Sequence, residues 1–326
     1  MGKPYVYITR NVPKETITSL EEVAEVAMWP HEEEPVPRNI LLQEAEKADG
    51  LFTMLSDKVD KELMDGAPHL KVIANLAVGF DNIDVQTATD KKIVVCNTPD
   101  VLTDTTADLT FALLMATARR IVEASDYVKD GKWKNWGPLL LAGTDIHHKT
   151  IGIVGMGRIG AAVAKRATGF DMEILYHNRS RNEKAEKELG ATYVSFDELI
   201  KRSDFVVCLA PLTKETENLF TWATFTLMKK SAIFINASRG AVVDEVALER
   251  ALEEKEIGGA GLDVFRVEPI SATHPLLRFK NVVALPHIGS SSMETRYAMC
   301  ELVSRNIANV LLGSKPETSV NPEVLG

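Results

Sequence analysis

One short turn constrains this 326-residue chain more than any other feature: Gly155, Gly157 and Gly160 follow one another in the spacing G-x-G-x-x-G. An apolar stretch, Thr150–Val154, precedes the turn and predicts a strand, and an alanine-rich stretch, Arg158–Ala167, follows it and predicts a helix. In this context the first glycine permits a tight turn, the second lets backbone approach a pyrophosphate, and the third lets helix and strand pack closely. Free N–H groups at the start of a helix favour phosphates. The turn predicts a dinucleotide site, although a methyltransferase would use a similar loop.

Short apolar runs and helical patterns alternate along both halves of the chain, which is typical of parallel strands joined by crossover helices. The length suits two domains of roughly 150 residues each. We therefore predict an α/β fold with two doubly wound parallel-sheet domains. The predicted strands are Tyr5–Thr9, Val23–Met28, Gly50–Met54, Val72–Leu76, Ile93–Cys96, Thr150–Val154, Glu173–Tyr176, Phe205–Leu209, Ala232–Asn236, Gly259–Leu262 and Val282–Ala284. The predicted helices run from Asn11 to about Glu22 and over Arg38–Lys47, Arg158–Ala167, Asp197–Lys201, Thr221–Leu227 and Asp244–Glu254.

Three further segments bear on how the two domains and the subunits are organised. The stretch Thr103–Ala118 is apolar almost all round, which predicts a buried helix suited to a spine or hinge between lobes. The long amphipathic stretch Ser291–Leu312 follows the last predicted strand, and we expect it to return to the first lobe. The loop Gly131–Gly143 contains Trp133 and Trp136. Such an apolar loop marks a subunit contact or lies tucked over its own domain.

Composition excludes several functions. Thirty-seven basic against 46 acidic side chains give a net charge of −9, so we expect no nucleic-acid partner. No stretch approaches the ~18 apolar residues of a membrane span, and no signal peptide opens the chain, so we expect a cytoplasmic protein with no membrane contact. Three scattered cysteines argue against a disulfide scaffold, and Cys96 and Cys208 lie in apolar runs that predict burial. We expect no metal ion.

The segment after the second strand of the glycine-turn half bears on the coenzyme. An Asp or Glu about 20 residues past the glycines usually binds the ribose 2′-hydroxyl of NAD. The matching position here is Asn178, followed by Arg179, Ser180 and Arg181. No carboxylate repels a 2′-phosphate, and two guanidinium groups can clasp it in fork geometry. The sequence favours NADP, with NAD as the alternative.

Three side chains follow strand ends in this half: Arg239, Glu268 and His287. Ligands of open parallel sheets bind at the carboxyl ends of strands, so we expect these side chains to converge on one cleft. Reduction of a 2-keto acid needs a hydride on C2 and a proton on the oxygen. Protonated His287 can give that proton as a general acid, and Glu268 can hold the ring and favour its charged form. Arg239 can bind the carboxylate and polarise the carbonyl.

These segments together resemble the D-isomer-specific 2-hydroxyacid dehydrogenase family, in particular its glyoxylate/hydroxypyruvate reductase branch. The matching residues run along nearly the whole chain: Asn75–Asp84, Asn97–Thr103, Gly155–Gly160, Asn236–Gly240 and Pro286–Gly289. The resemblance implies a Rossmann dinucleotide-binding domain, residues 100–289, inserted into a flavodoxin-like substrate domain, residues 1–99 and 290–326. It also implies a homodimer and an NADPH-dependent reduction of a small 2-keto acid, glyoxylate or hydroxypyruvate, to the D-2-hydroxy acid (EC 1.1.1.-).

The resemblance assigns roles to individual residues. The catalytic residues are Arg239, Glu268 and His287. The N–H groups of Val78 and Gly79 receive the substrate carboxylate, as a backbone anion nest would. Leu55 lies in a substrate-facing loop, Met54–Ser56, although Ser56 could instead cap a helix that starts at Asp57. The expected substrate-binding residues are Leu55, Val78, Gly79, Arg239 and His287, and the expected cofactor-binding residues are Thr103, Gly155, Gly157, Arg158, Ile159, Gly160, Asn178, Arg179, Ser180, Arg181, Ala237, Ser238, Asp263 and Gly289.

Two alternatives stay open. In some relatives a tryptophan of the dimer loop reaches the partner's active site, and that position here is Leu140, with Trp136 nearby. A 2-ketogluconate reductase is therefore one alternative. A non-catalytic, NAD(P)-sensing interaction protein like the C-terminal-binding-protein corepressors is the other, and the absence of long disordered tails argues against it.

Overall fold

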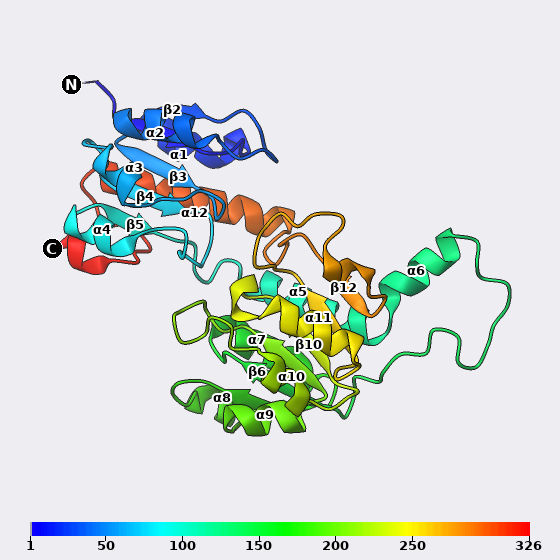
Figure 1. Cartoon of the computed structure of the whole chain (residues 1–326). Coiled ribbons are helices and arrows are strands. Elements are labelled where there is room, and N and C mark those ends of the chain that lie inside the picture. The colour runs from blue at the N-terminus through cyan, green and yellow to red at the C-terminus, as the bar shows by residue number, and fades with distance from the viewer. Residues whose placement is uncertain (1) are drawn as a thin grey trace. The chain divides into compact units, whose positions relative to one another are not determined.

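The computed structural model describes residues 2–326, and its internal contacts divide the chain into two compact units (Figure 1). The first unit comprises Met1–Leu102 and Ser292–Gly326, and the second comprises Thr103–Ser291. Every strand pairing in both sheets is parallel, as the alternation of strands and helices predicts. Both units are α/β with a doubly wound order of strands, which confirms the predicted fold class.

The first unit contains a five-stranded sheet in the order β2-β1-β3-β4-β5, which is the flavodoxin-like order. Its strands are β1 (Tyr5–Ile8), β2 (Glu25–Met28), β3 (Gly50–Thr53), β4 (Val72–Asn75) and β5 (Val94–Cys96). Its helices are η1 (Lys14–Ile17), α1 (Thr18–Val23), α2 (Arg38–Lys47), α3 (Lys61–Asp65), α4 (Val85–Asp90), α12 (Met293–Leu311) and η4 (Pro322–Leu325). The C-terminal helix α12 packs against α1, β3, β4 and β5, so the predicted return of this segment to the first lobe is confirmed.

The second unit contains a seven-stranded sheet in the order β12-β11-β10-β9-β6-β7-β8, the Rossmann order with one further strand at the β12 edge. Its strands are β6 (Thr150–Val154), β7 (Glu173–His177), β8 (Thr192–Tyr193), β9 (Phe205–Cys208), β10 (Ile233–Asn236), β11 (Gly259–Leu262) and β12 (Val282–Ala284). Its helices are α5 (Thr103–Ala118), α6 (Ile121–Lys129), α7 (Arg158–Thr168), α8 (Glu183–Leu189), α9 (Phe196–Arg202), α10 (Trp222–Leu227), η2 (Gly240–Val242), α11 (Glu245–Glu253) and η3 (Pro275–Arg278). Helix α5 is buried against α7 and strands β10 to β12, as its apolar circumference predicts.

The structure corrects the sequence-based prediction at several places. The first helical segment begins at Lys14 with a 3-10 turn and not at Asn11, because Pro13 starts that turn. Ser56 does not cap a helix starting at Asp57, since α3 begins at Lys61 and the Asp60 side chain accepts the capping bond from the Leu63 N–H. Short elements that the sequence reading did not predict are α3, α4, α6, α8 and β8.

An exposed apolar arm follows α5 in the second unit. Helix α6 buries none of its residues, and Figure 1 shows α6 and the loop after it extending away from the sheet of the same unit. The side chains of Trp136 and Leu139 are 78% and 82% exposed, and Trp133 is 60% exposed. The loop is therefore not tucked over its own domain, which leaves the subunit-contact alternative. No helix within residues 2–326 is both long and apolar enough to span a membrane.

Candidate active site

The glycine turn between β6 and α7 requires glycine at two positions for steric reasons. Gly155 has φ +104°, and a Cβ on it would lie 2.6 Å from the Ala210 nitrogen. A Cβ on Gly160 would lie 2.3 Å from the carbonyl oxygen of Gly155. These distances are shorter than any real Cβ contact, so strand, turn and helix approach as closely as they do only because both residues are glycine.

Gly157 differs from its two neighbours because the space beside it is open. No atom lies within 4 Å of the position that a Cβ would occupy. Gly157 is also the N-cap of α7, whose first N–H groups have no intrahelical partner. Arg158 and Ile159 open that helix. An uncluttered backbone beside free N–H groups fits the pyrophosphate of a dinucleotide.

Two of the residues after β7, Asn178 and Arg181, form hydrogen bonds within the chain that the sequence does not suggest. The Asn178 side chain accepts from the Met156 N–H at 2.7 Å, which ties it to the glycine turn. The Arg181 guanidinium donates twice to Glu186, at 3.0 and 2.6 Å, and this pair raises the pKa of Arg181. Arg179 and Ser180 are exposed. No carboxylate of residues 2–326 lies within 4 Å of Arg179.

The ends of β10 and β11 bring Arg239 towards Glu268. The Asn236 amide donates to the Arg239 carbonyl oxygen at 3.0 Å and thereby shapes the turn after β10. A Cβ on Gly240 would lie 1.8 Å from the carbonyl carbon of Phe265, so only glycine lets these two loops cross. The charge of Arg239 is one of the influences that lower the pKa of Glu268. Ala237 and Ser238 lie in the same turn and are half-buried.

His287 and Glu268 form a direct pair. The Nδ1 atom of His287 lies 2.7 Å from Oε2 of Glu268, and Oε1 of Glu268 accepts from the Phe265 N–H at 2.8 Å. Burial raises the pKa of Glu268, but the hydrogen bond and the charge of His287 outweigh burial, so the pKa ends below its usual range. The pair holds the imidazole through Nδ1, and Glu268 does not engage the other ring nitrogen, Nε2.

Asp263 connects the three strand ends. Its N–H donates to the Asn236 carbonyl, and its own carbonyl accepts from the His287 N–H, both at 2.9 Å. Its side chain accepts from the Ile288 N–H at 2.8 Å. Asp263 is 1% exposed, and burial raises its pKa despite these N–H donors. The bonds hold His287 at φ +56°, a backbone conformation rare for a residue other than glycine.

The first unit contains the other expected substrate residues, Val78 and Gly79. Three successive carbonyls after β4 accept hydrogen bonds: Ala77 from the Thr98 N–H at 2.8 Å, Val78 from the Asn97 amide at 2.8 Å, and Gly79 from the Asn75 amide at 3.0 Å. In a trans peptide the N–H points opposite to the carbonyl. The N–H groups of Val78, Gly79 and Phe80 therefore point away from these donors, and no acceptor in the described chain pairs with them. We refer to these three N–H groups as the nest, because free backbone N–H groups of successive residues can receive an anion.

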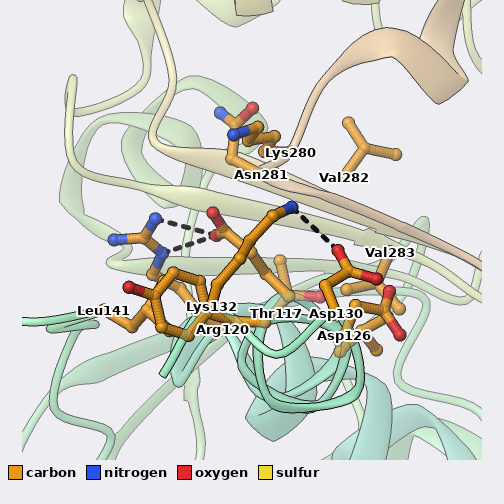
Figure 2. Close-up of a pocket in the computed structure, with 13 residues that line it drawn as sticks. Thr117, Arg120, Asp126, Asp130, Lys132, Leu141, Lys280, Asn281, Val282 and Val283 are labelled. Atoms are coloured by element: carbon orange, nitrogen blue, oxygen red, sulfur yellow. Dashed lines mark hydrogen bonds and ion pairs between the residues drawn. The ribbon is translucent and has the colours of Figure 1, made fainter. Parts of the chain in front are cut away.

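A cavity of about 450 Å³ lies elsewhere in the second unit, between α6 and the β12 edge (Figure 2). Its lining includes Arg120, Lys132, Asp130 and Lys280, and Figure 2 shows Lys132 reaching Asp130, at 2.8 Å. Arg120 is paired with Glu123. None of the three predicted catalytic side chains lines this cavity, so it is separate from the strand-end site.

The structure thus places the expected residues at four positions. The trio lies at the ends of β10 to β12 together with Asp263 and Gly289, the glycine turn opens α7, Leu55, Val78 and Gly79 lie in the first unit, and Thr103 begins α5. The sequence did not predict the linking role of Asp263 or the role of the amides of Asn75 and Asn97. Their only sequence signal is a polar residue at the end of a buried strand or directly after it. No three His, Cys, Asp or Glu side chains in residues 2–326 are grouped to hold a metal ion.

A Rossmann-type unit with an acid–base pair and an arginine at its strand ends defines a dinucleotide-dependent oxidoreductase. The sequence profile of the D-isomer-specific 2-hydroxyacid dehydrogenase NAD-binding domain matches residues 111–289. The chain belongs to the D-isomer-specific 2-hydroxyacid dehydrogenase family.

Individual relatives agree along the full length. The chain is 51% identical to the glyoxylate reductase of Thermococcus kodakarensis, over 99% of this chain and 98% of that protein. It is 50% identical to the glyoxylate reductase of Pyrococcus horikoshii, over 99% and 97%. Among solved structures, an NADPH-dependent glyoxylate/hydroxypyruvate reductase of Sinorhizobium meliloti, in complex with NADP and malonate, has a TM-score of 0.86 at 32% identity and covers 98% of this chain and 97% of its own.

The open space at Gly157 and the crowding at Gly160 predict opposite consequences of the same substitution. Gly157→Ala should leave the melting temperature unchanged but weaken dinucleotide binding at least ~10-fold, because the methyl group fills the space that the phosphates need. Gly160→Ala should lower the melting temperature, because its methyl group collides with the Gly155 carbonyl. Calorimetry and NADPH fluorescence titration measure both. Equal NADPH affinity in wild type and Gly157→Ala would contradict the assignment.

Proposed function

We propose that the protein catalyses the NADPH-dependent reduction of glyoxylate or hydroxypyruvate to the corresponding 2-hydroxy acid of D type. The observation that carries the proposal is the His287–Glu268 pair, 2.7 Å apart, at the strand ends that also hold Arg239. The coenzyme supplies a hydride for C2 of the keto acid, and His287 supplies a proton for the oxygen. The relatives named glyoxylate reductase, at about half identity over the full length, support this substrate class.

Each member of the trio has a separate task in the proposal. Nε2 of His287 donates the proton, while Nδ1 stays bonded to Glu268. Glu268 keeps its negative charge to lower pH than an ordinary glutamate, since its pKa is lowered, and it therefore favours the protonated ring. Arg239 binds the substrate carboxylate and polarises the carbonyl, with the N–H groups of Val78 and Gly79 as further donors. Leu55 contributes an apolar contact to the substrate.

The coenzyme preference for NADP rests on charge after β7. Asn178 replaces the carboxylate that would repel a 2′-phosphate, and Arg179 is exposed and near Glu215, whose pKa its charge helps to lower, but forms no direct ion pair among the described residues. Arg181 is engaged by Glu186 and lies 5.9 Å from the centre of the Tyr193 ring, so we assign the phosphate chiefly to Arg179. The NADP complex of the Sinorhizobium meliloti relative supports the same preference.

The exposed arm supports a homodimer. Trp133, Trp136 and Leu139 extend from a chain whose surface is otherwise acidic overall, and side chains of this kind are enriched where protein surfaces meet. A second copy of this chain is the partner that we propose for the arm. We place the enzyme in the cytoplasm, with a small 2-keto acid as its substrate.

Loss of the general acid should slow turnover selectively. We expect His287→Ala to lower kcat at least ~100-fold, because no other group replaces the proton donor. The affinity for NADPH should stay within about twofold, since the glycine turn is untouched. His147→Ala, an exposed histidine of the same unit, is the matched control and should behave as wild type. Near-normal turnover of His287→Ala would remove this residue from the mechanism.

The two arginines after β7 should differ in their effect on coenzyme choice. Arg179→Ala should raise KM for NADPH at least ~10-fold and leave KM for NADH nearly unchanged, because only NADPH carries the 2′-phosphate. Arg181→Ala should have the smaller effect on NADPH, since its guanidinium already binds Glu186. Steady-state kinetics with both coenzymes provide the measurement. A similar loss for NADH and NADPH would show that neither arginine reads the phosphate.

The Glu268 carboxylate should make the stability of the protein depend on pH. Burial raises the pKa of Glu268, but the hydrogen bond and the charge of His287 lower it below its usual range, so the folded protein keeps this carboxylate ionised to lower pH than the unfolded chain does. The resulting stabilisation is present near neutral pH and is lost as pH falls through the lowered pKa. Glu268→Gln should therefore lower the melting temperature near neutral pH, and the difference from wild type should shrink in acid. Calorimetry of both proteins across the acid range tests this, and a difference that does not change with pH would disconnect the charge of Glu268 from the pair.

A further inference from the structure

Three asparagine side chains in the first unit link the two loops that carry the proposed substrate contacts. We call Asn75, Asn82 and Asn97 the amide clamp. Asn75 ends β4 and is completely buried, while Asn82 and Asn97 are half-buried. Asn75 donates to Oδ1 of Asn82 at 3.0 Å, so two members of the clamp bond directly to each other.

One side of the clamp fixes the nest. The Asn75 amide donates to the Gly79 carbonyl at 3.0 Å, and the Asn97 amide donates to the Val78 carbonyl at 2.8 Å. Because these carbonyls are held, the N–H groups of Gly79 and Phe80 are aimed in the opposite direction. Without the two amides, either peptide plane is free to rotate, and a backbone N–H that is not pre-aimed binds an anion less well.

The other side of the clamp fixes the loop that contains Leu55. The Asn82 amide donates to the carbonyls of Met54 and Asp57, at 3.0 and 2.9 Å. The loop is closed on itself, since the Asp57 side chain accepts from the Met54 N–H at 2.8 Å. Asp57 is 3% exposed and also accepts from Thr9, so it anchors the loop in the core. Asn82 thereby holds both ends of the turn that presents Leu55.

At position 75 only a carboxamide meets the hydrogen-bonding requirements. Asn75 donates to Gly79 and Asn82 while its Oδ1 accepts from the Thr53 hydroxyl at 3.0 Å, so it needs a donor and an acceptor on one short side chain. An aspartate of the same shape has no donor when ionised, and its charge would oppose a bound carboxylate. The nest is thus served by neutral groups that add no negative charge beside the anion.

From these contacts we infer that the amide clamp is a set of positioning residues for substrate binding. The clamp sets the direction of the nest N–H groups relative to the Leu55 loop, and so controls the affinity for the carboxylate of the keto acid. The inference rests on the proposed function, which gives Leu55, Val78 and Gly79 to the substrate. It concerns no group that touches the coenzyme or transfers a proton.

The test uses Asn82→Ala and Asn97→Ala in the full-length protein, since both residues are half-buried. Gln86→Ala is the matched control, because this exposed amide of the same unit donates to Asp90. Each clamp variant should raise KM for glyoxylate at least ~10-fold, with kcat and the Kd for NADPH changed less than about threefold. Binding of oxalate, an unreactive dicarboxylate, should weaken in parallel in calorimetric titrations of the NADPH complex.

The outcomes separate the clamp from the proposed function. Unchanged KM and unchanged oxalate affinity in both variants, even with a lower melting temperature, would show a purely structural role and overturn the inference. If one variant fails to fold, the other decides. If the wild type reduces no 2-keto acid, the proposed function fails, and oxalate binding alone decides the clamp: weaker binding in the variants supports it, and equal binding or none in the wild type overturns it.

Discussion

The arrangement of Arg239, Glu268 and His287 depends on the hydrogen bonds that the buried residue Asp263 makes with its backbone and its side chain. Parallel strands bring their carboxyl ends to one edge, but the ladder of backbone bonds stops there, and each following loop is free to diverge. Asp263 replaces the missing ladder with its own N–H, its carbonyl and its side chain, which bind Asn236, His287 and Ile288. A buried acceptor that loses its partners costs about 1–3 kcal/mol, so these loops have little freedom to move apart.

In the first unit, side-chain amides hold the loop that follows a strand end. After β4 the chain leaves the sheet, and three consecutive carbonyls find donors on Thr98, Asn97 and Asn75 instead of a neighbouring strand. In both units, therefore, a polar side chain at a strand end provides hydrogen bonds where the sheet ends. The two devices differ in charge, since the amides of Asn75 and Asn97 are neutral donors whereas the Asp263 side chain is a carboxyl group that accepts from the Ile288 N–H.

Most of the helices and strands could be predicted from the sequence, and particular elements show why. The long helices α5 and α12 and the buried strands were predicted because burial imposes a pattern of apolar residues. Helix α8 was missed because Glu183–Leu189 is almost entirely polar and shows no apolar stripe. The pairing of Arg181 with Glu186, five residues further along, was not predicted, and the expected contact of Arg181 with a phosphate stays a prediction. In the sequence Asn75 looks like an ordinary turn residue. Its role could not be predicted, because its hydrogen-bond partners lie on other segments of the chain.

The negative net charge of the chain explains why neutral hydrogen-bond donors are useful for binding anions. A net charge of −9 disfavours the approach of anions, and both proposed ligands are anions. In the proposed function, backbone N–H groups at α7 and after β4 bind the negative oxygens through their dipoles, which carry no net charge and so form no ion pairs with the carboxylates of the chain. Several arginines of the second unit, including Arg166, Arg181 and Arg202, are indeed paired with carboxylates. Selectivity for an anion then depends on how rigidly the peptides are held in one direction. This is why we infer a role in substrate recognition for residues such as Asn75, which position the peptides and are not proposed to contact the ligand.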